Sequence, residues 1–184
     1  MVIQRTEHGG RQGIGGAIRS WLRSVAAVPP HTVSPRVDAL KHPGSALVLH
    51  DLTEKIVSYE STNPDPTGTT PTENDFAKVA LDIFDADGTK IGHTAGAGRM
   101  LYRQDDGEGS FLAYFGETIT LDTGTVIRSG GLVDDGRLTA GEPACFPAVA
   151  VAGPLRGAIG YRTFRPLVKE THDTYVSSIV LYRD

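Results

Sequence analysis

Several short motifs in this sequence combine residue types that catalyse reactions or bind ions. Asp122-Thr123-Gly124 matches the tripeptide of aspartic proteases, but those enzymes need a second aspartate as a dyad, and here the tripeptide separates two alternating segments as a hairpin turn does. Asp85–Gly88 is similar to part of a calcium loop, yet the first ligand position falls on Ile83, which has no side-chain oxygen. Gly13–Gly16 follows no strand, which argues against a dinucleotide-binding turn. We therefore expect none of these motifs to be a reaction centre.

Histidine and cysteine, which commonly carry catalysis or bind metals, are scattered along the chain. The histidines are His8, His31, His42, His50, His93 and His172. No two of them have the tight spacing of a zinc site, so we expect no metal. The single cysteine, Cys145, is expected to be a small buried apolar residue rather than a nucleophile. No serine lies in a nucleophile elbow, and the sequence thus favours a binding protein or an enzyme that acts mostly through shape.

Length and composition limit the class of protein. The chain has 184 residues, 39% hydrophobic and 22% charged, with a net charge of −4, which fits one soluble globular domain with an appendage. No broad basic surface is indicated, so nucleic acid is not an expected partner. The longest apolar runs, such as Ala148–Ala152, are too short to cross a membrane, and no signal peptide is recognised. With one cysteine, a cytoplasmic location fits best.

Most of the chain after residue 44 alternates apolar and polar residues, as β-strands do. Turn signals such as Asp87-Gly88 and Asp134-Asp135-Gly136 separate the alternating segments. The expected strands are Ala46–Leu52, Lys55–Ser61, Ala77–Ala86, Lys90–Arg103, Ser110–Leu121, Thr125–Val133, Ala144–Val151, Gly157–Val168 and Thr174–Arg183. Short connections make neighbouring strands antiparallel, and about eight such strands can close into a barrel without exposed edges. The expected fold is all-β, an eight-stranded antiparallel β-barrel over residues 45–184.

The N-terminal region, residues 1–44, differs from the rest. We expect a flexible tail, an amphipathic helix over residues 14–28 that Pro29 and Pro30 end, and a linker. The apolar stripe of this helix consists of Ile14, Ile18, Trp21, Leu22 and Val25. Because so short a helix is marginal alone, its stripe must dock on another surface.

Alternation also assigns faces within the strands, because successive side chains of a strand point to opposite sides. Arg99 and Arg103 are expected to face water, which turns Met100 and Tyr102 inward. The other groups that share a face are Leu81 with Ile83, Phe111 with Phe115 and Glu117, and Arg162 with Phe164. A single bulge would reverse such an assignment.

Ordered segments between Asp82 and Arg165 resemble the actinobacterial spirotetronate and spirotetramate cyclases. The segments are Asp87–Gly92 (DGTKIG), Gly98–Tyr102 (GRMLY), Tyr114–Leu121 (YFGETITL), Phe146–Ala148 (FPA) and Gly157–Arg165 (GAIGYRTFR). The resemblance implies an antiparallel barrel related to allene oxide cyclases that needs no cofactor and is often a homodimer. It implies an intramolecular Diels–Alder reaction between a diene and an exocyclic alkene on a polyketide-derived tetronate or tetramate ring, which forms a spiro ring.

The aromatic positions of the family pocket fall, by resemblance, on Phe115, Phe146 and Phe164, with Arg162 beside Phe164. Phenylalanine stands where better-known members have tyrosine or tryptophan at some of these positions, which removes hydrogen-bond donors. The expected substrate-binding residues are Phe115, Phe146, Phe164, Met100, Leu81, Ile83, Phe111, Trp21 and Leu22. The long N-terminal extension resembles one that acts as a lid in spirotetramate cyclases; the alternative is a helix packed permanently outside the sheet.

A cycloaddition needs no proton transfer, so the expected catalytic residues Arg162, Tyr102 and Glu117 would act by other means. Arg162 or Tyr102 could donate a hydrogen bond to the ring carbonyl; for Arg162 the alternative is a salt bridge with Glu117. The phenylalanines could equally be ordinary core residues that fill the barrel. Two other functions stay open: a lipocalin-like carrier of a hydrophobic small molecule, and an oxide cyclase acting on an epoxide lipid, in which Glu117 would pair with a water molecule.

Overall fold

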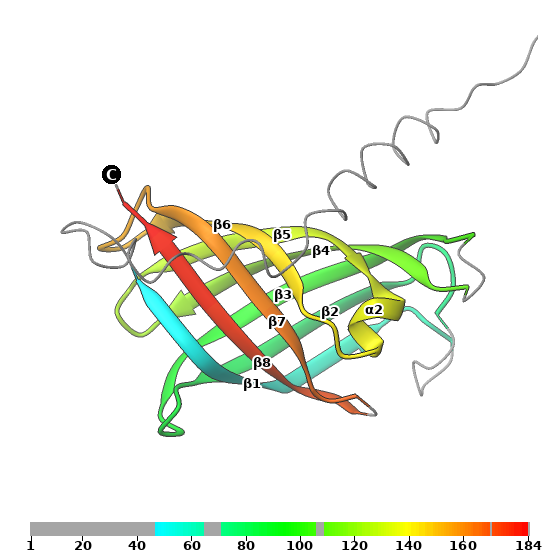
Figure 1. Ribbon diagram of the computed structural model, residues 1–184, viewed down its shortest axis with the longest axis horizontal. Coiled ribbons are helices and arrows are strands. Elements are labelled where there is room, and N and C mark those ends of the chain that lie inside the picture. Colours follow the sequence, from blue (N-terminus) through cyan, green and yellow to red (C-terminus); the bar gives the residue numbers. More distant parts are fainter. Residues whose placement is uncertain (1–46, 65–70, 106–108, 170, 184) are drawn as a thin grey trace, which may run out of the picture. The chain divides into compact units, whose positions relative to one another are not determined.

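The computed structural model describes residues 47–64, 71–105, 109–169 and 171–183, which form a closed antiparallel β-barrel (Figure 1). Each strand pairs with the next one in sequence, and β8 returns to pair with β1. The strands are β1 Val48–Ser61, β2 Phe76–Phe84, β3 Lys90–Arg103, β4 Phe111–Leu121, β5 Val126–Asp134, β6 Ala144–Ala152, β7 Ile159–Val168 and β8 Thr171–Tyr182. The expected eight-stranded barrel is confirmed, and β3 has the limits that the sequence predicted.

Strand β1 runs without interruption through Thr53 and Glu54. Our prediction of two separate strands there, Ala46–Leu52 and Lys55–Ser61, is therefore wrong. Both residues pair with β2 on one side and with β8 on the other, so the backbone hydrogen bonds of a closed barrel hold two polar residues in the strand. Continuity of β1 puts Glu54 on the same inward face as Leu52, and both are buried.

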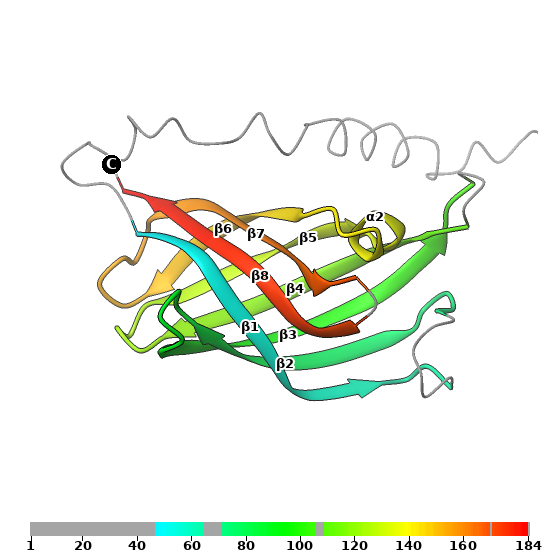
Figure 2. The same ribbon diagram turned by 60° about the horizontal axis from the view of Figure 1, so that its bottom comes forward.

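The two ends of the barrel are packed differently. At the end that carries the C-terminus, side chains of the inner face form an apolar core: Leu52, Ile83, Ile119, Leu121, Ile127, Ala148, Ala150, Ala158, Ile179 and Leu181. The opposite end, which Figures 1 and 2 show beside the short helix α2 (Asp135–Thr139), holds a second cluster that is mainly aromatic. The inside of the barrel is thus divided into an apolar half and an aromatic half.

Helix α2 stands where the sequence predicted only a turn at Asp134-Asp135-Gly136. The carboxylate of Asp134 accepts the backbone N–H of Arg137 at 3.1 Å, which caps the helix. Leu138 of α2 packs against the aromatic cluster. The connection therefore contributes an apolar side chain to this end of the barrel.

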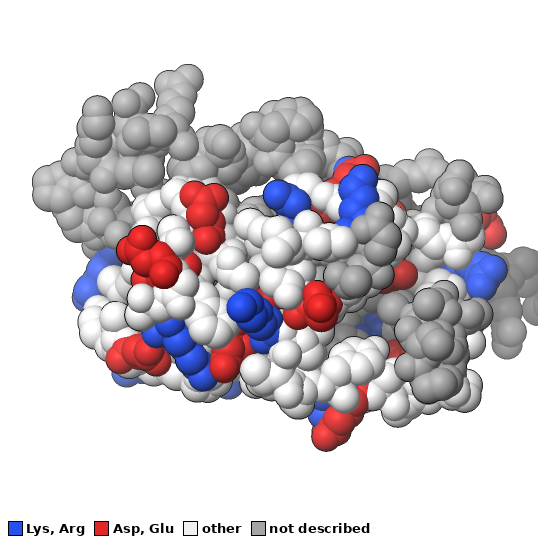
Figure 3. Space-filling view, turned by 90° about the horizontal axis from the view of Figure 1, so that it is seen from below, with Lys and Arg blue, Asp and Glu red and all other residues white. Residues whose placement is uncertain are grey.

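The outer surface mixes basic and acidic side chains over the face that Figure 3 shows. Cys145 is exposed on this outer side of β6, because its neighbour Phe146 takes the inward position; the predicted burial of Cys145 is wrong. No helix in the described parts of the chain is long and apolar enough to span a bilayer. The predicted tail, the helix over residues 14–28 and the linker lie outside the described residues.

Candidate functional site

Three charged side chains meet in the middle of the barrel. Arg162 of β7 donates through Nη2 to Oε2 of Glu54 on β1 at 2.8 Å, and its Nε lies 2.7 Å from Oε1 of Glu117 on β4. The exposed fractions are 2% for Arg162, 0% for Glu54 and 6% for Glu117. The three strands are not neighbours in the sheet, so closure of the barrel is what brings these groups together. Of the two roles that the sequence left open for Arg162, the salt bridge with Glu117 is confirmed, and Glu54 is a second partner.

Glu54 is fixed by further hydrogen bonds. The hydroxyl of Ser177 on β8 donates to its Oε1, and the hydroxyl of Thr94 on β3 donates to its Oε2 at 3.4 Å. With the bond from Arg162, side chains from three strands thus hold one carboxylate. Such a buried network restricts the positions of all its members, so Glu54 sets the position of the guanidinium of Arg162.

Two carboxyl groups share a single guanidinium, and the pKa of one of them is raised. Burial raises the pKa of Glu117 from 4.5 to about 7 against the opposing charge of Arg162, and the nearby charge of Glu54 adds to the rise. A proton on Glu117 leaves one carboxylate and one guanidinium, which costs less to bury than a net negative charge does. Near neutral pH, Glu117 therefore exchanges between its protonated and ionised forms inside the barrel.

Arg162 also has donor capacity that the protein does not use. Its Nη1 is buried and has no hydrogen-bond partner among the described residues, and the Nε contact with Glu117 is an ion pair outside hydrogen-bonding geometry. A buried donor without an acceptor costs free energy. A carbonyl oxygen of a bound molecule would remove that cost, which makes Nη1 a candidate binding atom.

A layer of phenylalanine rings lies on the α2 side of the charged cluster. The ring centroids are 5.4 Å apart for Phe146 and Phe164, 5.9 Å for Phe115 and Phe164, and 6.3 Å for Phe115 and Phe146. The ring of Phe164 also lies 4.9 Å from the guanidinium carbon of Arg162 and meets Tyr175 edge-on. Phe146 and Phe164 are buried, whereas Phe115 and Tyr175 are half-buried. The aromatic layer therefore contacts the charged cluster through Phe164 and reaches solvent at Phe115 and Tyr175.

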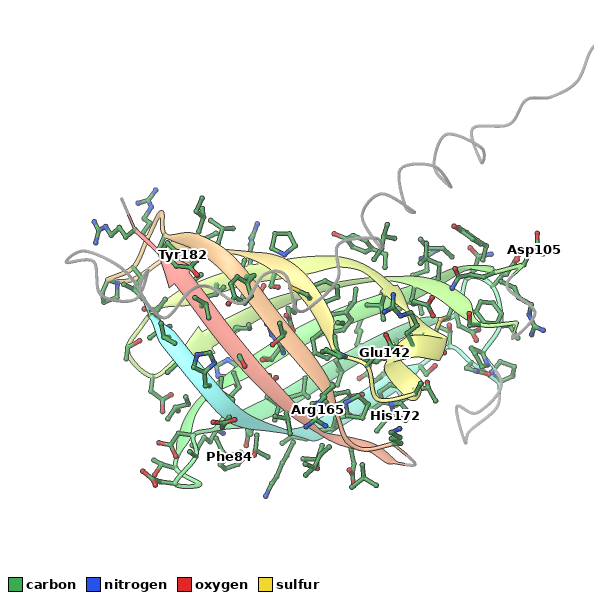
Figure 4. The ribbon with its side chains drawn as sticks, viewed as in Figure 1. Phe84, Asp105, Glu142, Arg165, His172 and Tyr182 are labelled. Atoms are coloured by element: carbon green, nitrogen blue, oxygen red, sulfur yellow. The ribbon has the colours of Figure 1, made fainter. Side chains whose placement is uncertain are left out.

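The other predicted pocket residues are spread along the barrel. Leu81 and Ile83 point inward from β2 and are buried, but Ile83 belongs to the apolar core at the C-terminal end rather than to the aromatic half. Met100 is half-buried toward the far end of β3. Phe111 is buried, and the guanidinium of Arg103 lies 5.1 Å from its ring centroid. Figure 4 shows the two ends of the barrel, with Tyr182 toward one end and Glu142, just after α2, toward the other.

Tyr102 lies on the opposite side of its strand from Met100. Met100 pairs with Ala113 of β4, whereas Tyr102 pairs with Leu112, because Leu101 is an extra residue in a bulge. Ala113 and Leu112 are successive residues and point to opposite faces, and paired residues share a face. The prediction that Tyr102 turns inward together with Met100 is therefore wrong, since the bulge reverses the alternation.

Sequence reasoning missed several residues of this region. They are Glu54, Thr94, Ser177, Tyr175 and Leu138. The alternation Leu52, Glu54, Ile56 could have indicated an inward Glu54, had β1 been taken as one strand. Trp21 and Leu22 lie outside the described residues, so their predicted contact with a ligand stays a prediction. Within the described ranges, no group of three His, Cys, Asp or Glu side chains is placed to hold a metal ion.

Comparison with known families gives the same type of barrel. Residues 55–181 match the family model described as allene oxide cyclase barrel like domain. This chain belongs to the allene oxide cyclase barrel-like family. The family relationship that the ordered segments implied is therefore confirmed. A search of curated proteins finds no match.

Solved structures of similar fold include three members of this barrel type. One is a cyclase described as nonspecific heme-binding and as catalysing a [4 + 2] cycloaddition during neoabyssomicin biosynthesis; it is 23% identical, covers 100% of this chain and 84% of its own, and has a TM-score of 0.72. The Diels–Alderase AbmU from Streptomyces koyangensis is 21% identical over 98% of this chain and 84% of its own, with a TM-score of 0.69. AbnU, described as an exo-specific intermolecular Diels–Alderase, is 21% identical over 75% of this chain and 97% of its own, with a TM-score of 0.66. At these identities the likeness establishes the shared fold.

Proposed function

We propose that this barrel is a cyclase that catalyses a [4 + 2] cycloaddition on a polyketide-derived substrate with a tetramate or tetronate ring. In this proposal the reaction is intramolecular, forms a spiro ring and needs no cofactor. The observation that carries it is Nη1 of Arg162, which has no hydrogen-bond partner in the described part of the chain; the guanidinium is held by Glu54 and adjoins a layer of phenylalanine rings inside the barrel. The described activities of the structurally similar barrels, [4 + 2] cycloaddition and Diels–Alder reaction, support the same chemistry.

Positioning of the substrate supplies most of the proposed catalysis. A linear substrate carries the diene and the alkene on one flexible chain, and holding both ends in contact removes entropy from the barrier, up to about 7–11 kcal/mol for ideal alignment. The rings of Phe115, Phe146 and Phe164 offer rigid apolar faces to a polyene, whose burial contributes roughly 25 cal/mol per Å². Rigid faces admit one folded shape of the chain and therefore favour one configuration of the product.

The charged cluster adds activation of the alkene. A hydrogen bond from Nη1 of Arg162 to the ring carbonyl withdraws electron density from the conjugated alkene, and one such donor is worth about 2–4 kcal/mol in comparable sites. Protonation of Glu117 strengthens this effect, because the guanidinium then shares its positive charge with one carboxylate instead of two. The site is thus suited to a neutral carbonyl oxygen as acceptor.

Substrate entry requires the aromatic layer to open. The three phenylalanine rings contact one another, so a polyene must displace at least one of them. Phe115 is the half-buried member of the three, so in this proposal its ring rotates to give access to Arg162. Binding of substrate is therefore coupled to a change of the Phe115 rotamer.

One alternative has an observation of its own in its favour. The pKa of about 7 that burial gives Glu117 suits a carboxyl group that transfers a proton near neutral pH, as an oxide cyclase acting on an epoxide lipid would require. A carrier of hydrophobic molecules would use the same aromatic layer without any reaction.

Incubation of the full-length protein with linear tetramates and tetronates that bear a diene and an exocyclic alkene tests the proposal. We expect a spiro product that forms faster than in buffer and with one configuration, as measured by chiral chromatography and NMR. Binding of the linear compound without conversion would instead identify a carrier. Conversion of an epoxide lipid, with the linear compounds unchanged, would favour the oxide cyclase.

A further inference from the structure

Glycines on the inner face of the barrel lie directly against two of the phenylalanine rings. A Cβ atom added at Gly96 of β3 would lie 2.6 Å from Cζ and 3.1 Å from Cε2 of Phe115. One added at Gly131 of β5 would lie 2.9 Å from Cδ1 and 3.3 Å from Cε1 of Phe146. Non-bonded carbon atoms pack at about 3.5–4.0 Å. Each ring therefore occupies the space that any larger residue at the glycine position would need.

Backbone conformation does not explain these glycines. Gly88 and Gly124, in turns, have φ values of 80° and 82°, which favour glycine. Gly96 and Gly131 do not have positive φ, and both pair regularly with β4 in the sheet. The backbone conformation at both positions would also accept alanine. Glycine therefore matters there because it has no side chain and leaves space for the rings.

A methyl group at either glycine would move a ring toward the inside of the barrel. Phe115 lies against Gly96 and Gly98 of β3 on one side, and its neighbours on the other side are the rings of Phe146 and Phe164. When the side facing β3 is filled, the ring is pushed toward those two rings, into the space that a substrate would take. The same holds for Phe146, which is 1% exposed and lies against Gly131.

We infer that Gly96 and Gly131 determine specificity: by letting the rings of Phe115 and Phe146 lie back against the barrel wall, they set the width available to a folded polyene. The inference rests on the proposed function. It also specifies the substrate class, because a long or substituted diene needs the space into which these rings can move aside, and a short diene does not. The two glycines act through the rings and do not touch the reacting atoms.

Substrate discrimination in alanine variants tests this inference. For Gly96→Ala and Gly131→Ala we expect about a tenfold loss in kcat/KM for the full-length linear substrate, which is the effect of one methylene in an apolar pocket. A shortened substrate should lose less, and the ratio of product configurations should change. Gly116→Ala is the matched control: its Cβ would point away from the rings, 3.6 Å from Cε1 of Tyr114, an ordinary contact. We expect its discrimination to equal that of the wild type.

Two further variants keep the test decisive if Gly96→Ala does not fold. Gly98→Ala makes a milder contact, 3.3 Å from Cδ2 of Phe115. In the double variant Gly96→Ala with Phe115→Leu, the smaller leucine side chain compensates for the volume of the added methyl group. We expect this variant to accept the long substrate again, because the effects of two residues in contact are not additive.

Affinity measurements separate a failure of this inference from a failure of the proposed function. If the wild type forms no ring, calorimetric affinities for long and short tetramates still report the width, and Gly96→Ala should lower the long-to-short ratio while Gly116→Ala leaves it unchanged. An unchanged ratio in folded Gly96→Ala, Gly98→Ala and Gly131→Ala would overturn the inference, whether or not the wild type is a cyclase.

Discussion

The Nε atom of Arg162 on β7 lies 2.7 Å from Oε1 of Glu117 on β4, across the interior of the barrel. Glu54 on β1 holds the other side of the same guanidinium at 2.8 Å. This bridge separates the apolar core at the C-terminal end from the aromatic layer at the α2 end. It thus places a cation, whose Nη1 has no acceptor among the residues that the structure describes, next to the rings that would bind a substrate.

The stability of the protein should depend on pH through Glu117. Its pKa is 4.5 when the chain is unfolded and about 7 in the fold. Between these pH values the folded protein holds a proton that the unfolded chain does not hold, so the free energy of unfolding falls as pH rises through this window. At about 1.4 kcal/mol per pH unit the total fall is about 3 kcal/mol. Below the window both states are protonated, above it both are ionised, and the dependence ends.

Denaturant unfolding of Glu117→Gln at both ends of this pH window measures that dependence. The variant should lose most of the slope, because glutamine has no proton to exchange. Glu142→Gln is the control, since Glu142 forms an exposed salt bridge with Arg137, and it should keep the slope. Equal slopes in both variants would show that Glu117 is not the group responsible.

The rate of ring formation should fall as pH rises through about 7, where Glu117 ionises. The ionised carboxylate competes for the charge of Arg162 and weakens the hydrogen bond to the substrate carbonyl. A profile of kcat against pH measures this, and Glu117→Gln should flatten the profile. A rate that rises through the same pH range would contradict this role and would fit a general base instead.

Replacing Arg162 separates its structural role from its catalytic one. Arg162→Met should lower stability by about 3–5 kcal/mol, because it leaves two carboxyl groups buried without a counter-charge. The triple variant Arg162→Met, Glu54→Gln, Glu117→Gln should recover most of that stability, yet form product about a hundredfold more slowly for want of the donor. Denaturation followed by circular dichroism measures the stability, and single-turnover kinetics measures the rate of product formation. Arg165→Met is the control. Arg165 lies three residues after Arg162 on the same strand but is exposed, so this variant should keep both its stability and its rate of product formation.

Phe164→Leu should reduce both substrate affinity and the preference for one product configuration. The change removes a ring that stacks on Arg162 at 4.9 Å and contacts Phe146, and a desolvated cation–π contact is worth up to about 2 kcal/mol. Phe84→Leu removes a comparable contact with Lys55, 5.2 Å from the ring centroid and outside the aromatic layer. Calorimetry with a linear tetramate should show weaker binding for the first variant alone; equal losses would mean that the aromatic layer does not bind the substrate.

The sequence predicted the barrel and part of its interior because period-two alternation is a local property of each strand. Phe115 and Glu117, and likewise Arg162 and Phe164, were assigned to shared faces in this way, and the closed barrel brings both pairs together. Arg162 and Glu117 are far apart along the chain, so only the closure of the barrel, which the number of strands implied, could bring them into contact.

The remaining features depend on events that alternation does not contain. Glu54 was missed because two polar residues resemble a break between strands, whereas pairing on both sides keeps them in β1. Tyr102 was assigned to the wrong face because the bulge at Leu101 is not visible in the sequence pattern. Helix α2 was taken for a turn, since Asp134 favours turns and helix caps alike.

Isotope-edited infrared spectroscopy detects the proposed hydrogen bond from Arg162 itself, with a linear tetramate analogue labelled at the ring carbonyl and bound to the protein. We expect a carbonyl stretch at lower frequency in the wild type than in solvent, and a return toward the solvent frequency in the variant that replaces Arg162, Glu54 and Glu117 together. A bound carbonyl with the same frequency in both proteins would contradict a hydrogen bond from Arg162.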